Sequence, residues 1–490
     1  MNAEAQRKPS PSGDPLAGGK LSTGAKLSTG GKLSTGAKLG YGVGDLSSGL
    51  MFQTINFYFL YFLTDVVRLV PQLAGLAVML GKIYDGVTDP VMGYLSDRTR
   101  TRWGRRRPYL LLSAIPFGLA FFLVFLSPAL TQTGKFWYAV GMFVFLCTGY
   151  TVFTVPYAAM TADLTRDYDE RTNLTSYRML FSILGTLIAG AATMIIVGLK
   201  PTEKDGFAFM GLVFGAVIAV AAIVCFLGTK ERAAAADDET TLPFFTGMRL
   251  ALANRPFRMA LVIYLLSQCA MAIVSALLIY YLKYAAGLGE QSSLVFGLLL
   301  VVAIASLPLW VKLSAIMGKA RAFALGLAIQ GTAMLLFALL PTGMPWAVYA
   351  LVVVAGVGTA THFIFPWSMI PDVVEYDQLT TGQRRAGTFY GLWLLTQKVA
   401  AATGVMLSGA LLGFFGYSAG AEQSARALLG LRLGIGPVPV LLLVAAALLL
   451  LRYPINRSAH EAVVRQIEAG RATSTTPTSI GHETTGGGGK

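Results

Sequence analysis

Long apolar runs constrain this chain more than any other feature of its sequence. Runs of about 20 apolar residues recur along most of its length, and each is long enough to cross a bilayer as a helix. Only 13% of the 490 residues are charged and 54% are hydrophobic, whereas a soluble domain carries roughly a quarter charged residues. The pattern predicts an all-α membrane protein.

We expect twelve of these runs to be transmembrane helices, in two sets of six separated by a polar segment. Two six-helix halves, with a substrate held between them near mid-membrane, are an arrangement that transporters use repeatedly. The sequence therefore predicts the major facilitator fold. The runs cover residues 46–67, 72–96, 108–129, 136–161, 176–199, 206–228, 257–284, 291–314, 321–340, 346–370, 386–416 and 433–454.

The polar segments between and around the runs set the expected domain boundaries. The first forty residues repeat the motif Lys-Leu-Ser-Thr-Gly, which is typical of a flexible cationic tail. The predicted units are a disordered cytoplasmic N-tail (1–40), a first bundle (41–228), a cytoplasmic linker (229–256), a second bundle (257–455) and a cytoplasmic C-tail (456–490).

The net charge of +14 is explained by loops of a membrane protein rather than by nucleic-acid binding. Lys and Arg gather in the tails and in the loops on one side of the spans, above all in the run from Arg98 to Arg107. Cytoplasmic loops of membrane proteins carry this excess. We expect both termini to be cytoplasmic, the chain to sit in a bacterial inner membrane as a monomer, and no nucleic acid to bind.

Charges within membrane spans are costly and mark candidate functional sites, and here we single out Lys82, Asp85, Asp89, Arg178 and Lys398. Asp85 and Asp89 lie one helical turn apart, so both carboxylates face the same way. Two like charges at that distance repel unless a cation lies near them. We expect them to bind the coupling ion, Na⁺ or H⁺, with hydroxyl oxygens from Thr88 and Thr151. The alternative is a buried ion pair with Lys398 or Lys82 that serves helix packing only.

Other polar and aromatic residues in the spans are candidate substrate contacts. Gln53 and Asn56 share one helix face, as substrate ligands or as an interhelical pair, and an aromatic ring suits a sugar ring or a lipid chain. Pro156 is expected to break the fourth span locally. The candidates are Gln53, Asn56, Tyr150, Thr154, Arg178, Trp393 and Lys398.

The arginine run after the second span has a second predicted role besides orienting the chain. Asp97 closes that span, and its carboxylate could pair with arginines in one conformation only. We therefore name a cytoplasmic gate made of Asp97, Arg98, Arg105 and Arg106.

The stretch Tyr84-Asp-Gly-Val-Thr-Asp-Pro-Val-Met-Gly, followed by Arg-Thr-Arg-Trp-Gly-Arg-Arg-Arg-Pro, resembles the glycoside–pentoside–hexuronide (melibiose permease-like) cation symporters of the major facilitator superfamily. The resemblance implies that Asp85 and Asp89 bind the cation with help from Thr151. It also implies that Lys398 interacts with them and that Arg178 lies near a sugar. The family often has Asn where Thr88 stands.

Two departures from that family bear on the substrate. Its galactoside carriers have aspartates where this chain has Gly49 and Thr154, and Asp45 lies one turn before the first of these. The family also includes animal sodium-coupled lysophosphatidylcholine symporters. We expect cation-coupled symport of a sugar, glycoside or uronide, with an amphiphile such as a lysophospholipid as the alternative and a non-transporting sensor as a remote one. We expect neither enzymatic activity nor a cofactor besides the ion.

Overall fold

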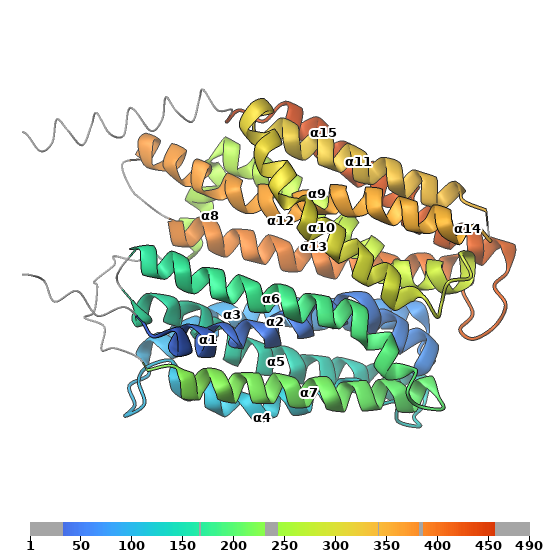
Figure 1. The fold of residues 1–490 in the computed structure, drawn as a ribbon, viewed down its shortest axis with the longest axis horizontal. Coiled ribbons are helices and arrows are strands. Elements are labelled where there is room, and N and C mark those ends of the chain that lie inside the picture. The colour runs from blue at the N-terminus through green and yellow to red at the C-terminus, as the bar shows by residue number, and fades with distance from the viewer. Residues whose placement is uncertain (1–32, 166–167, 231–243, 342, 382–385, 456–490) are drawn as a thin grey trace, which may run out of the picture.

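The computed structural model describes residues 33–165, 168–230, 244–341, 343–381 and 386–455, and they form two helical halves that lie side by side (Figure 1). The first half consists of α1 (Thr35–Gly42), α2 (Gly44–Thr54), α3 (Pro71–Arg98), α4 (Arg107–Val124), α5 (Gln132–Leu164), α6 (Tyr168–Val197) and α7 (Glu203–Gly228). The second consists of α8 (Phe244–Ala253), α9 (Arg255–Tyr280), α10 (Ser292–Met317), α11 (Lys319–Leu339), α12 (Pro345–Thr381), α13 (Ala386–Phe414), α14 (Ala425–Ile435) and α15 (Pro437–Leu451).

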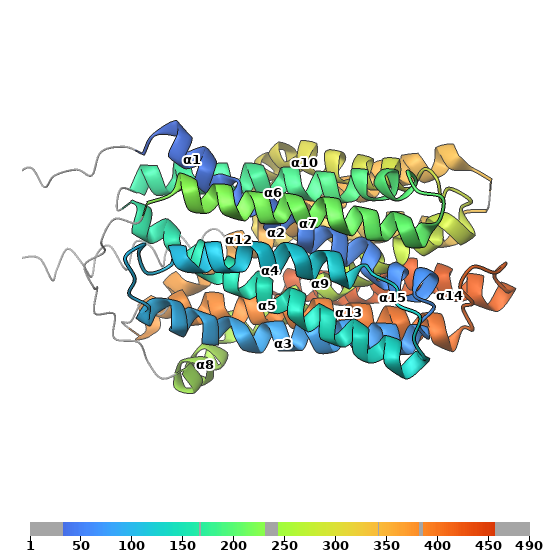
Figure 2. The same ribbon diagram turned by 90° about the horizontal axis from the view of Figure 1, so that it is seen from below.

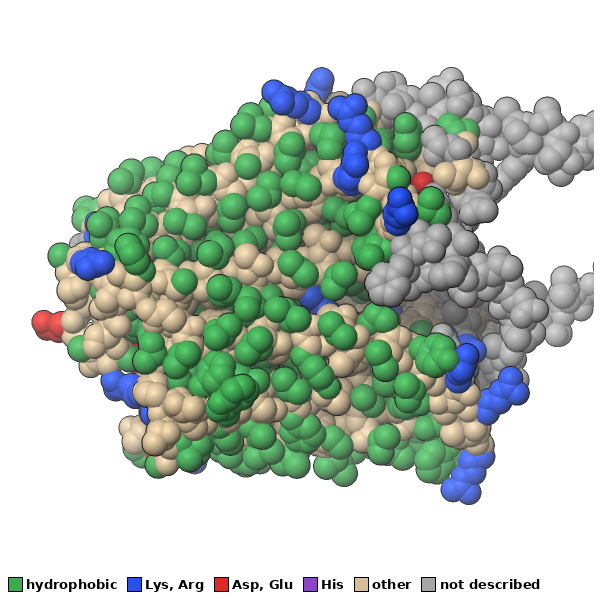
Figure 3. All heavy atoms as spheres, turned by 180° about the vertical axis from the view of Figure 1, so that it is seen from behind, with side chains coloured by type: hydrophobic (Ala, Val, Ile, Leu, Met, Phe, Trp, Pro, Cys, Tyr) green, Lys and Arg blue, Asp and Glu red, His purple; other side chains and the backbone are tan. Residues whose placement is uncertain are grey.

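The described helices account for the twelve predicted crossings. Ten segments of the described chain are long and apolar enough to span a membrane. The other two crossings are the path from α1 to Val66, which contains two five-residue π-helical turns, and α3, which carries three charged residues in its middle. Hydrophobic side chains cover most of the face in Figure 3, and Lys and Arg gather towards its ends. The predicted fold is confirmed.

The first helix begins earlier than expected. α1 starts at Thr35, inside the predicted tail, because Ser34 caps it by accepting a hydrogen bond from the Ala37 amide at 3.2 Å. Glu170 of α6 then holds this segment through an ion pair with Lys38 at 3.1 Å. The rest of the predicted tail, residues 1–32, lies outside the described residues, as do 231–243 and 456–490.

Three further expectations about the helices need correction. The predicted linker contains a helix, α8, which packs against α9 and α13. The last crossing starts at Ala425, not at residue 433, and bends at Gly436 between α14 and α15. Pro156 does not interrupt its span, because α5 runs through it as one helix; a membrane helix tolerates the one lost backbone hydrogen bond.

The two halves meet along two helix pairs, α3 with α13 and α6 with α10 (Figure 2). The first pair crosses at small residues: a Cβ added at Gly409 would lie 2.5 Å from the backbone oxygen of Pro71, and one at Gly75 would lie 3.2 Å from that of Met406. Small residues let membrane helices approach this closely. This crossing fixes α13 against α3, the helix that carries the two aspartates.

Candidate functional site

The predicted carboxylate pair is assembled from three helices. Asp85 and Asp89 project from α3, Thr151 from α5 and Lys398 from α13. The Thr151 hydroxyl oxygen lies 2.9 Å from Asp85 Oδ1 and 2.9 Å from Asp89 Oδ1. The Lys398 ammonium lies 2.7 Å from Asp85 Oδ2 and also donates to Asp89 Oδ2 and, at 3.2 Å, to the Asp85 backbone oxygen. A cation from the second half therefore bridges two anions of the first.

The number of protons at this site limits how many of these short contacts are hydrogen bonds. A threonine hydroxyl carries one hydrogen, so Thr151 donates to only one of the two carboxylates at a time. Its second short contact is favourable when the other carboxyl carries a proton or when a cation shares the oxygens. Hard cations bind carboxylate, hydroxyl and carbonyl oxygens. The cluster thus has the donor set for one additional positive charge.

Thr88 does not join this cluster. Its hydroxyl donates back to the Tyr84 and Asp85 backbone oxygens, at 3.2 Å each. Threonine in a helix commonly satisfies itself in this way. The structure does not place the Thr88 hydroxyl with that of Thr151 at the carboxylates, and its role as an ion ligand stays a prediction.

A cavity of about 560 Å³ adjoins the carboxylates, and we call it the charged lobe. It contains both aspartates, Lys82 and Lys398, with Tyr150 and Thr154 from α5 on its wall. A second cavity of about 170 Å³, the amide lobe, adjoins it: the two share Phe52, Gln397 and Ala401. The amide lobe contains Gln53, Asn56, Gln268, Gln330, His362 and Trp367.

Most predicted substrate contacts thus line one continuous space between the halves. Gln53 and Asn56 share the amide lobe, while Tyr150, Thr154 and Lys398 share the charged lobe. Sequence reasoning missed Gln330 and His362, which form a buried pair with 2.7 Å between the Gln330 oxygen and the His362 Nε2. The sequence did offer a signal for this pair, because an amide and an imidazole within apolar spans are candidate functional residues.

Arg178 does not line either lobe. Its guanidinium donates to Asp45 at 2.7 Å and to the Thr161 hydroxyl at 3.2 Å, and it stacks over the Tyr157 ring at 4.7 Å. The structure thus places Arg178 outside both lobes, and its substrate role stays a prediction. Its charge is balanced by Asp45, for which the sequence had indicated no partner.

Trp393 is also packed away from the cavity. Its ring stacks on Tyr264 with 4.1 Å between centroids, and only 1% of its surface is exposed. The structure thus places the Trp393 side chain in the core between α9 and α13, outside both lobes, and its substrate role stays a prediction. A different tryptophan, Trp367, does line the amide lobe.

The departure at Gly49 has a steric explanation. A Cβ at this position would lie 2.3 Å from the backbone oxygen of Ser182, and a Cβ at Gly185 would lie 2.5 Å from that of Leu46. α2 and α6 therefore touch backbone to backbone here. An aspartate at position 49 has no room in this packing, so a sugar is not held from this point.

The arginine run contacts the first half. Arg106 donates to the Ala159 oxygen near the end of α5, Arg107 donates to the Phe226 oxygen in the last turn of α7 at 2.8 Å, and Arg98 lies over the Tyr94 ring at 4.1 Å. Cations are stabilised at helix carboxyl ends. These contacts of Arg98 and Arg106 lie within the first half. The gate of Asp97, Arg98, Arg105 and Arg106 stays a prediction, and the side chain of Asp97 lies outside the described residues.

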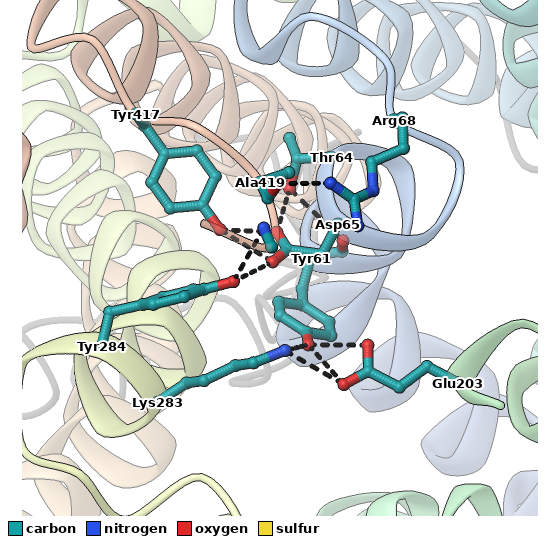
Figure 4. Close-up of polar contacts among 10 residues, drawn as sticks. Tyr61, Thr64, Asp65, Arg68, Glu203, Lys283, Tyr284, Tyr417 and Ala419 are labelled. Carbon is teal, nitrogen blue, oxygen red and sulfur yellow. Dashed lines mark hydrogen bonds and ion pairs between the residues drawn. The ribbon is translucent and has the colours of Figure 1, made fainter. Parts of the chain in front are cut away.

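The halves are instead joined at the end opposite α1 and α8, by what we call the closing cluster (Figure 4). Asp65 of the first half accepts hydrogen bonds from the Tyr284 hydroxyl at 2.5 Å and from the Tyr417 hydroxyl at 2.7 Å. Nearby, Lys283 pairs with Glu203 at 3.0 Å, and Arg68 donates to the Ala419 oxygen.

The comparisons with known proteins decide the family. The model of the family described as MFS/sugar transport protein matches residues 40–457. The chain belongs to this family. Among its relatives, a protein of Escherichia coli named a putative glycoside/cation symporter, YagG, is 30% identical, with 88% of this chain and 95% of that protein covered. The sodium-dependent lysophosphatidylcholine symporter 1-A of Danio rerio is 27% identical, with 87% of each chain covered.

A solved structure shows the same fold. A bacterial homologue of the human lysosomal transporter Spinster, in an inward-facing and unoccupied conformation, superposes with a TM-score of 0.64 at 15% identity, with 88% of this chain and 97% of that one covered. The protein is therefore a multi-pass membrane transporter, a cation-coupled symporter of this family and not an enzyme. Its substrate is a small molecule.

Proposed function

We propose that the protein couples the entry of Na⁺ or H⁺ to the uptake of a sugar, glycoside or uronide by alternating access. The observation that carries this proposal is the Lys398 ammonium held between Asp85 and Asp89. It is an ion pair that bridges the two halves at the wall of the cavity. Any cation that binds the carboxylates must compete with this lysine.

Competition of this kind links ion binding to movement of the halves. When the coupling ion, or a proton on one carboxyl, neutralises the pair on α3, Lys398 on α13 loses its partners. The contact between α3 and α13 then weakens. Conformations in which these two helices pack together lose stability relative to conformations in which they pack differently. A ligand shifts a conformational equilibrium by the difference in its affinity for the states. Ion and substrate together favour the state that both bind best.

A sugar is the substrate class that the cavity supports best. Five amides and an imidazole line the amide lobe without any charged residue: Gln53, Asn56, Gln268, Gln330, Gln397 and His362. Neutral donors and acceptors match hydroxyl groups, and Phe52 and Trp367 add flat apolar surface beside them. The alternative, a lysophospholipid, is supported by the zebrafish relative and by the largely apolar remainder of the walls.

We further propose that the protein is a monomer in a bacterial inner membrane with both termini in the cytoplasm. The Lys- and Arg-rich loops then lie on the cytoplasmic side, and the closing cluster lies on the periplasmic side. In this orientation the closing cluster joins the halves at the periplasmic end, and the carboxylate pair joins them beside the cavity.

Reconstitution into proteoliposomes tests this function. We expect accumulation of a sugar or uronide under an imposed inward Na⁺ or H⁺ gradient and none when the gradient is dissipated. A thermal-shift screen of sugars against lysolipids selects the substrates to be used. Binding of these ligands without gradient-driven uptake of any of them would show a sensor instead of a symporter.

A further inference from the structure

Lys82 on α3 is a buried residue, 8% exposed, and the Asp85 carboxylate on the same helix compensates its charge only from a distance. No Asp or Glu among the described residues forms an ion pair with it. Its ammonium, with three hydrogens to donate, makes one hydrogen bond, to the Asn56 amide oxygen at 3.3 Å, and lies 5.5 Å from the centre of the Phe52 ring. A buried charge without a direct ion-pair partner is costly, and the described residues do not supply that partner.

The position of Lys82 makes that partner a ligand of the cavity. Lys82 lines the charged lobe one helical turn before Asp85. Its hydrogen-bond partner Asn56 lines the amide lobe, and Phe52 lines both lobes. The ammonium therefore lies where the two lobes join. A ligand with its ring in the amide lobe would have its edge within reach of this lysine.

The charge of the cavity points the same way. The charged lobe contains two cations, Lys82 and Lys398, and two anions, Asp85 and Asp89. A coupling ion on the carboxylates adds one positive charge and leaves both lysines without carboxylate partners. Uncompensated charge in a low-dielectric site is unfavourable. A substrate with one negative charge restores neutrality, so it binds best when the ion is bound.

We propose that Lys82 binds an oxyanion of the substrate, so that the transported molecule is an organic anion carried together with the coupling ion. This inference rests on the proposed function and narrows it. The shared chemistry is a carboxylate or phosphate next to a hydroxylated part that the amides bind. A sugar acid supplies the carboxylate, and a lysophospholipid supplies the phosphate.

The first test compares matched ligands that differ in the anionic group. Methyl glucuronide is compared with methyl glucoside, and lysophosphatidylglycerol with monoacylglycerol, for binding to the purified full chain and for uptake. We expect one anion to bind roughly tenfold or more tightly than its neutral match, as loss of a charged hydrogen bond predicts. The pair that shows this difference identifies the source of the oxyanion.

Variants then assign the difference to this lysine. In Lys82→Gln the preference for the anion should fall by roughly tenfold, and Lys82→Arg should restore most of it. Thermal unfolding of both variants verifies that they fold. An undiminished preference for the anion in folded Lys82→Gln, or a wild-type protein that binds the neutral match as tightly, overturns the inference.

Charge movement separates this inference from the function on which it rests. One monoanion carried with one monovalent cation moves no net charge, so uptake should give no transient current on a supported membrane. If a neutral glycoside is taken up under the gradient and each molecule moves one positive charge across the membrane, the proposed role of Lys82 is overturned. The proposed symport function would still stand. Absence of gradient-driven uptake of all four ligands counts against both.

Discussion

Removing the charge of Asp65 should open the end of the molecule that the closing cluster holds shut. Asp65 accepts two hydrogen bonds across the halves, from Tyr284 at 2.5 Å and from Tyr417 at 2.7 Å. Hydrogen bonds to a charged group contribute about 1.5–3 kcal/mol and neutral ones about 1 kcal/mol. Asp65→Asn keeps the shape and loses the charge, so the closed state should lose about 2 kcal/mol, or roughly thirtyfold in the equilibrium.

The exposed ion pair of the same cluster provides the matched control. The side chains of Lys283 and Glu203 are 31% and 44% exposed, and exposed ion pairs contribute about 0–1 kcal/mol. Glu203→Gln should therefore shift the equilibrium by less than about fivefold. Asp65→Asn should exceed it clearly, although both substitutions remove one carboxylate from the same end.

Distances between spin labels at Leu130 and Glu422 measure this equilibrium. The two positions are exposed, lie in loops of different halves and belong to the end that closes. The longer distance should be populated in Asp65→Asn and rare in the wild-type protein and in Glu203→Gln. Equal populations in Asp65→Asn and wild type would refute the assignment of the cluster.

The closing cluster should not respond to moderate changes in pH through its loop tyrosine. Burial and the nearby Asp65 carboxylate raise the pKa of Tyr417, which lies between α13 and α14. A raised pKa keeps the phenol protonated, and hence a donor, well above neutral pH. The hydrogen bond from Tyr417 to Asp65 should therefore persist when the pH is raised moderately above neutral.

Three further substitutions test other parts of the site. Thr151→Val should raise the cation concentration for half-maximal uptake roughly tenfold, Thr151→Ser should restore it, and an unchanged activation curve for Thr151→Val would argue against a ligand role. Asp45→Asn should cost about 3–5 kcal/mol of stability by leaving Arg178 unpaired; thermal unfolding should show that Arg178→Gln partly compensates, and additive losses would contradict the pairing. Trp393→Ala should cost about 3–5 kcal/mol yet leave ligand affinity unchanged, and a selective loss of affinity would return Trp393 to the substrate site.

The parts of the site that the sequence predicts correctly depend on local geometry. Asp85 and Asp89 share a face because they are four residues apart on one helix, whatever surrounds that helix. Charges in an apolar span must also find partners, which limited the candidates for the carboxylates to a few residues. Lys398 was among them, and the structure places it there.

The features of the site that the sequence does not predict have a common physical cause. In a soluble helix the polar face reveals which side is buried, but a membrane helix is apolar all round, so its sequence does not show which residues face the core, the cavity or the lipid. Trp393 was therefore assigned to the cavity, although its ring packs on Tyr264. Contacts across long sequence separations, such as Asp45 with Arg178, depend on how helices are arranged and leave no local pattern.

Concentrative uptake by proteoliposomes that contain Asp85→Asn or Asp89→Asn tests the central claim most directly. The account predicts that wild-type protein accumulates substrate under an imposed cation gradient and that neither variant does, while both still exchange labelled substrate for unlabelled without a gradient. Gradient-driven accumulation at the wild-type level by both variants would contradict it, because coupling would then not depend on the carboxylate pair.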